Sequence, residues 1–292
     1  MSDALHLTRS LVAPPGPLVD DRSRHQIRDR LVGTLAPMMD RLPQGDQVVV
    51  TLPLLRLART GPELLAQPEE PFSWRPAFVR RSLGLAVVSS CARGRFRAPA
   101  DAVAPVADEA VAEWERTGWR TFHWEPWLAG LAPGARAVVL ADSLTWATAL
   151  WSSLDWGVFA SPPQIGGVDD QWICPASRTL RLKARAELRV PLQPAPSRHR
   201  RGGGSAPAAA LVSVSTGCPG DGWADELAYL ALAAGLRSTT RPVPARVVGL
   251  WPDAGSHASV DIDRQALDGA VDRVVTTVAA VVEARSSSAV GT

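Results

Sequence analysis

The sequence predicts an α/β protein in which a mixed β-sheet is flanked by helices and preceded by a mainly helical N-terminal extension. In the first half of the chain, apolar residues recur at helical spacing. In the second half, short alternating runs typical of strands appear between two such helical segments. From residue 135 onward the expected order is helix, strand, strand, strand, helix, strand, helix.

The first 70 residues are expected to form a separate extension. It begins with a Pro-rich lead over residues 1–22, followed by a helix over 23–43 and a possible strand over 47–55. A change in composition at Pro71 marks the expected domain boundary, so that residues 71–292 form the second domain. Apolar spacing predicts its first helices over residues 77–91, 101–118 and 134–156.

A regular alternation dominates residues 179–190. Apolar residues at the even positions predict one buried face, and the odd positions carry four cations and one acid. This face suits either a solvated antiparallel strand or a row that binds phosphate, because guanidinium groups match phosphate oxygens. Twelve residues are long for one strand, so a bend or bulge is expected within it. The charged face comprises Arg181, Lys183, Arg185, Glu187 and Arg189.

The next strand is expected over residues 211–217 (LVSVSTG), after a Gly-rich loop. Alternation places Val212 and Val214 on a buried face and Ser213 and Ser215 together on the other. A helix over residues 221–237, a strand over 245–251 and a C-terminal helix over 263–284 complete the expected order.

Composition narrows the class of protein. The 292 residues are 46% apolar, enough for a sizeable core. The three cysteines have no CxxC spacing, which argues against a disulfide framework and a metal cluster. The net charge of +2 is too small to indicate nucleic-acid binding by itself, so that inference must rest on local clustering. Without an apolar run of about 18 residues or a signal-peptide pattern, we expect a cytoplasmic protein that does not contact a membrane.

Four short segments occur in an order that resembles the PD-(D/E)XK nuclease superfamily, particularly its RecB-type branch. Residues 183–188 (KARAEL) are similar to the G-R-x-D-x strand of that branch, and residues 211–217 to its V-D-x-K-T-G strand. Residues 225–229 (DELAY) resemble its Q-x-x-x-Y helix, and residues 243–255 the strand and turn that follow. The resemblance implies a restriction-endonuclease-like sheet whose motif-bearing core spans about residues 166–285.

The resemblance also implies where a catalytic site would lie and how this chain departs from it. Such nucleases bind magnesium between two acids on neighbouring strands, and a lysine steadies the attacking water. Here Glu187 keeps the first acid, whereas Ser213 stands at the second acid and Ser215 at the lysine. Asp225 replaces the glutamine, and Tyr229 keeps the tyrosine. A single glutamate among arginines would pair with a guanidinium sooner than hold a divalent cation.

Two hypotheses follow. In the first, the protein is a catalytically degenerate nuclease-like protein without a cofactor that binds DNA or another nucleic acid, or serves as a scaffold for a protein partner. Its nucleic-acid contacts would be Arg181, Lys183, Arg185 and Arg189. In the second, it is a metal-dependent DNA nuclease in which Glu187 and relocated acids hold Mg²⁺.

Overall fold

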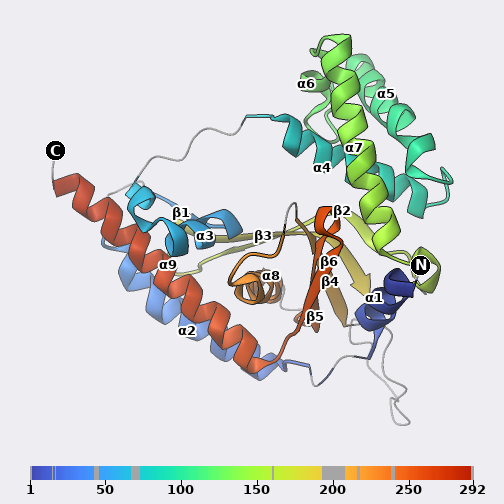
Figure 1. The fold of residues 1–292 in the computed structure, drawn as a ribbon. Coiled ribbons are helices and arrows are strands. Elements are labelled where there is room, and N and C mark those ends of the chain that lie inside the picture. The colour runs from blue at the N-terminus through green and yellow to red at the C-terminus, as the bar shows by residue number, and fades with distance from the viewer. Residues whose placement is uncertain are drawn as a thin grey trace.

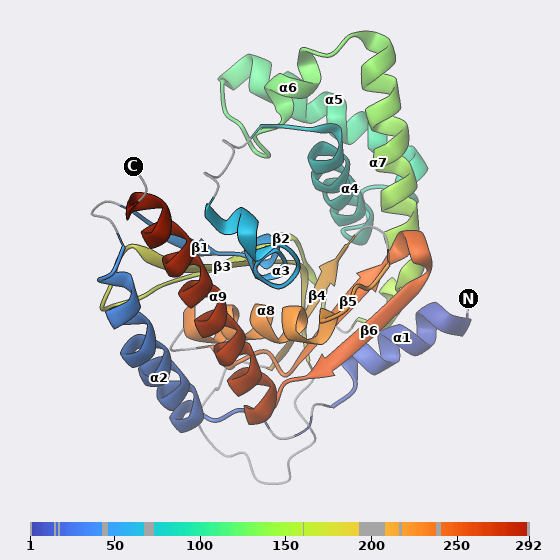
Figure 2. The ribbon, with the colours of Figure 1, turned by 60° about the vertical axis from the view of Figure 1, so that its left-hand side comes forward.

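The computed structural model describes residues 2–42 except 15 and 17, together with 46–66, 73–159, 161–192, 208–215, 218–237 and 241–290. Within these ranges six strands form one mixed sheet in the order β1-β3-β4-β5-β6, and β2 pairs with β3 outside that path. Figures 1 and 2 show helices on both sides of the sheet. None of the helices in the described ranges combines the length and apolar composition needed to cross a bilayer.

The second half of the chain confirms the predicted order of elements as far as β5. Strand β2 (Gln164–Ile173) runs antiparallel to β3 (Leu180–Pro191), and β3 runs antiparallel to β4 (Ala209–Val214). Helix α8 (Trp223–Arg237) then connects β4 to β5 (Arg246–Trp251), which lies parallel to β4. One further strand, β6 (Ser256–Asp261), was not predicted; it is an antiparallel edge strand before α9 (Arg264–Val290).

Two hydrophobic clusters lie on opposite faces of the sheet. One contains apolar residues of α8 and α9 together with α2 (Asp21–Met39) and α3 (Leu52–Thr60). The other belongs to a helical lobe, which projects to one side of the sheet in Figure 1. The lobe is formed by α4 (Pro76–Ala92), α5 (Pro99–Thr117), α6 (Glu125–Ala129) and α7 (Pro133–Ser153), and α1 (Ser2–Val12) joins its cluster.

The N-terminal residues are part of these layers. Strand β1 (Val48–Val50) pairs in parallel with β3, so this segment belongs to the same sheet as the motif-bearing strands. The strand expected over residues 47–55 is wrong beyond Val50, because Thr51 caps α3 and accepts a hydrogen bond from Leu54 N–H at 3.3 Å. Residues 2–12 of the expected loose lead form α1. The helical lobe is therefore inserted between two strands of one sheet.

Strand β3 changes faces along its length, as its unusual length suggested. The even residues from Leu180 to Ala186 belong to the α8 and α9 cluster, whereas Leu188 and Val190 belong to the lobe cluster. The register with β2 shifts between Ile165 and Val168, opposite this change. The prediction that the odd residues from Arg181 to Arg189 share one face is therefore wrong, because that face is divided at Glu187.

Candidate functional site

The candidate site lies at a gap in the sheet along one edge of β3. Strand β2 occupies the other edge of β3 over residues 181–189. On the gap side, β1 pairs with residues 180–182 and β4 with residues 188–191. Between these two ladders, side chains and not a paired strand form hydrogen bonds with the backbone. Glu187 and Tyr229 both make hydrogen bonds to the backbone there.

Glu187 is fully buried at this gap, and both of its carboxylate oxygens have partners. Oε2 accepts a hydrogen bond from Val214 N–H at 2.7 Å, next to the last β3–β4 register pair, Leu188 with Val212. Oε1 accepts a hydrogen bond from Nη2 of Arg81 in α4 and forms an ion pair with it. The carboxylate thus joins β3, β4 and the helical lobe.

The two serines flank the backbone group that Glu187 binds. Val214 and Val212 pack in the lobe cluster, whereas Leu211 packs in the cluster of α8 and α9. Alternation along β4 therefore directs Ser213 toward α8, away from the lobe that supplies Arg81. Ser213 is buried and Ser215 half-buried. Thr216 and Gly217, the end of the predicted motif, lie outside the described residues.

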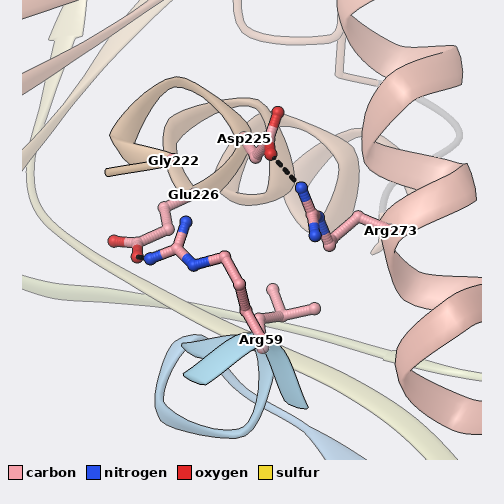
Figure 3. Close-up of a pocket in the computed structure, with 6 residues that line it drawn as sticks. Arg59, Gly222, Asp225, Glu226 and Arg273 are labelled. Atoms are coloured by element: carbon pink, nitrogen blue, oxygen red, sulfur yellow. Dashed lines mark hydrogen bonds and ion pairs between the residues drawn. The ribbon is translucent and has the colours of Figure 1, made fainter. Parts of the chain in front are cut away.

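Asp225 lies in the first turn of α8, where its carboxylate forms a 2.5 Å ion pair with Arg273 of α9. Its neighbour Glu226 accepts two hydrogen bonds from Arg56 of α3, and Arg59 lies 3.8 Å from it. Figure 3 shows Asp225 and Glu226 at a shallow pocket between α3, α8 and α9, with each acid beside an arginine. Asp225 therefore connects α8 to α9 through its ion pair with Arg273.

Tyr229 fills the other part of the gap. Its hydroxyl donates a 2.6 Å hydrogen bond to the carbonyl of Val50 in β1 and lies 3.2 Å from the carbonyl of Lys183 in β3. Burial raises the pKa of this phenol well above its ordinary range, although the contact with the Lys183 carbonyl opposes the shift. Tyr229 thus holds α8 to two strands, and sequence spacing had indicated only that it shares a helix with Asp225.

Three of the four predicted nucleic-acid contacts lie on one face of β3. Lys183 and Arg185 are exposed, and Arg181 is half-buried beside Ile173 of β2, whose side chain is 46% exposed. Arg189 was predicted to share this face, which is wrong. It lies beyond the face change, where Asp170, Arg237 and Arg241 act on its charge. We call Arg181, Lys183 and Arg185 the basic face.

Sequence reasoning missed Arg81, the residue that neutralises Glu187. It lies 106 positions before Glu187, within a helix whose apolar pattern predicted only core packing. A buried acid in a strand signals that a cation must approach it, but that signal does not identify which of many arginines does so.

The resemblance implies Mg²⁺, and the residues at the gap do not fit it. Magnesium requires octahedral coordination by hard oxygen ligands, usually carboxylates with free lone pairs facing the ion. The Glu187 oxygens already receive a guanidinium and a backbone N–H, Ser213 and Ser215 are neutral, and Asp225 pairs with Arg273. These contacts instead hold together the elements around the gap in the sheet.

Comparisons with protein-family models, curated proteins and solved structures found no match for this chain.

Proposed function

We propose that this protein is a non-catalytic, PD-(D/E)XK-like nucleic-acid-binding protein with a restriction-endonuclease-like sheet. The order α7, β2, β3, β4, α8, β5 agrees with the order on which the resemblance rests, and supports that fold type. The observation that carries the proposal is the state of Glu187. The acid expected to hold the metal is buried and bound by Arg81 and by Val214 N–H.

The basic face supports the binding part of the proposal. Lys183 and Arg185 are exposed on β3, and Arg181 lies two residues before Lys183 on the same face. Cations at this spacing can contact successive phosphates of a nucleic-acid backbone, which carries most of the affinity in sequence-independent binding. Among the described residues, we take the basic face as the feature that favours nucleic-acid binding over a scaffolding role for a protein partner.

The test is the salt dependence of DNA binding. We expect the wild-type protein to bind labelled single- and double-stranded oligonucleotides at low salt, with affinity falling linearly in log–log form as salt rises. Lys183→Gln and Arg185→Gln should each weaken binding several-fold and reduce the salt slope by about 1.

Arg136→Gln is the matched control. Arg136 pairs with Asp108 in the helical lobe, away from β3, so its loss should leave both affinity and slope unchanged. Absence of binding by the wild-type protein at low salt would refute the nucleic-acid role. Equal affinities of all variants would refute the assignment to the basic face.

A further inference from the structure

One side of helix α4 becomes more exposed toward the start of the helix. Phe78, Arg81 and Leu85 share this side, because residues three, four and seven positions apart lie on one face of a helix. Leu85 is 1% exposed and packs in the lobe cluster, the Arg81 side chain is 39% exposed, and Phe78 is 47% exposed. The side that is packed at Leu85 is therefore open to solvent two turns earlier, where it presents an aromatic ring.

Strand β3 shows the same change along its length. Glu187 is fully buried where Arg81 binds it, whereas Arg185 and Lys183, two and four residues earlier, are exposed. The ion pair between Arg81 and Glu187 thus joins the helix and the strand at one point. Before that point, the helix carries the exposed ring of Phe78 and the strand carries the exposed cations.

Helix α4 and the basic face lie on the same side of the sheet. The even residues of β3 from Leu180 to Ala186 pack toward α8 and α9, so the odd residues between them point to the side that carries the lobe. Strand β3 begins beside β1 and ends beside β4, and Figure 1 shows α4 also beginning nearer to β1 than it ends. The exposed parts of both elements therefore extend in the same direction from the ion pair.

Helix and strand geometry limit the distance between the ring and the cations. Three residues of helix rise about 4.5 Å, which separates Phe78 from Arg81 along α4. Two residues of strand extend about 7 Å, which separates Arg185 from Glu187 along β3. Because Arg81 and Glu187 are in contact, Phe78 and Arg185 lie within a distance that a few nucleotides can span.

Exposed cations beside an exposed aromatic ring suit single-stranded nucleic acid. The cations contact phosphates, and the ring can stack on any base, because every base has a π face. In a duplex the bases are already stacked on one another, so a ring gains such a contact only at the cost of unstacking them. We propose that the nucleic acid bound by the basic face is single-stranded and that Phe78 stacks on one of its bases. This inference rests on the proposed nucleic-acid binding and specifies its ligand.

Binding of a labelled oligo(dT) to the full chain tests the inference, measured beside the same strand annealed to its complement. We expect the wild-type protein to bind the single strand more tightly at physiological salt. Phe78→Leu should weaken single-strand binding by at least about fivefold, because a base–aromatic stack is lost. The salt slope should stay unchanged, since a phenyl ring displaces no counterions. Phe78→Trp keeps an aromatic ring and should bind at least as tightly as the wild type.

Trp119→Leu is the matched control. Trp119 is 71% exposed and follows α5, outside both α4 and β3, so its loss should leave DNA binding unchanged. Thermal unfolding of each variant checks that it is folded. The inference is overturned if the duplex binds as tightly as the single strand, or if Phe78→Leu binds the single strand no more weakly than Trp119→Leu does.

These outcomes are distinct from the fate of the basic face. If Lys183→Gln weakens binding and lowers the salt slope while Phe78→Leu binds as the wild type does, nucleic-acid binding stands and the single-strand inference fails. If the wild-type protein binds neither substrate at low salt, the proposed function fails, and this inference fails with it.

Discussion

Glu187 carries a negative charge at a position without solvent exposure, and its neighbours explain how the fold tolerates it. Transfer of a carboxylate from water into the interior costs several kcal/mol unless a cation and hydrogen-bond donors replace the lost water. Arg81 and Val214 N–H supply both. The Arg81 side chain is 39% exposed, so solvent also reaches the cation and weakens the pair.

We expect Arg81→Met to destabilise the protein, because it leaves the Glu187 charge buried without a counterion. The loss in the free energy of unfolding should be roughly 3 kcal/mol, near the lower limit for breaking a buried pair because Arg81 is partly exposed. The double variant Arg81→Met, Glu187→Gln should be more stable than Arg81→Met alone, since the amide oxygen can still accept from Val214 N–H. Urea denaturation at neutral pH measures all three proteins.

Arg116→Met is the control for this series. Arg116 pairs with Glu113 on the surface of the lobe, where the two side chains are 70% and 48% exposed. Its loss should change stability by less than about 1 kcal/mol. A double variant less stable than Arg81→Met would show that the Glu187 charge does not need Arg81.

Tyr229 is the single tyrosine of the chain, so its ionisation can be followed without interference from another phenol. Burial raises its pKa in the folded state, and an unfolded tyrosine titrates near about 10. The neutral phenol therefore contributes stability that is complete below that pH and is lost as the pH rises above it. We expect no tyrosinate absorbance from folded protein at about pH 10.5, and its appearance on unfolding in urea at that pH.

Tyr229→Phe provides the matching stability measurement. Removal of the hydroxyl leaves the Val50 carbonyl at the gap without this donor, which should cost about 1–2 kcal/mol at neutral pH. The variant should also lose less stability than the wild type above about pH 10. Tyrosinate absorbance from folded wild-type protein at about pH 10.5 would contradict the buried placement of this side chain.

At the scale of elements, helix α4 depends on a close approach to α7. A Cβ on Gly84 of α4 would lie 2.4 Å from the ring of Trp146 in α7, and Trp146 is 1% exposed. Alanine normally stabilises a helix interior by about 1 kcal/mol relative to glycine. Here we expect Gly84→Ala to lower stability by about 1–3 kcal/mol, because the packed indole has no free space to move into.

Gly33→Ala in α2 is the control with the opposite sign. No atom lies within 4 Å of the added Cβ, so alanine should raise stability by up to about 1 kcal/mol. Thermal unfolding of both variants gives the comparison. If both substitutions were stabilising, α4 and α7 would not pack through Gly84.

Element prediction succeeded where a periodic pattern was long and local. The helices over residues 76–92, 133–153 and 223–237 lie close to their expected limits, as does β3. Element prediction failed where a capping residue determines where a helix begins. Residues 47–55 alternate between apolar and polar only briefly, and Thr51 with Pro53 starts a helix that propensity alone did not indicate. The edge strand β6 has no fully buried residue, so its inward positions (Ser256, Ala258 and Val260) need not be strongly apolar and give little strand signal.

For the candidate site, the sequence predicted which elements carry the residues, but not their partners. The positions of Glu187 and Tyr229 in a strand and a helix followed from local spacing, but their partners are set by tertiary contacts. Arg81 reaches Glu187 from an inserted lobe, and the irregular β3 ladder moves Arg189 to the other face. A face change of this kind has no reliable sequence signal, since the alternation of apolar residues continues through it.

At the scale of the whole molecule, the inserted lobe and the sheet meet through Glu187. The ion pair with Arg81 ties α4 to β3, while the shared cluster of apolar residues buries the face of β4 and β5 against the same lobe. Figure 2 shows the helical lobe to one side of the sheet. The Glu187 carboxylate at this junction holds two parts of the fold together, and Lys183 and Arg185 on the same strand are exposed to solvent.

The most direct test of this account is DNA cleavage by the purified full chain in millimolar Mg²⁺ or Mn²⁺, measured beside Glu187→Gln. The account predicts that single- and double-stranded substrates stay intact, with wild-type protein and variant indistinguishable, under conditions in which both bind DNA. Metal-dependent cleavage by the wild-type protein that a folded Glu187→Gln variant lacks would contradict it, because Glu187 would then act on a metal ion.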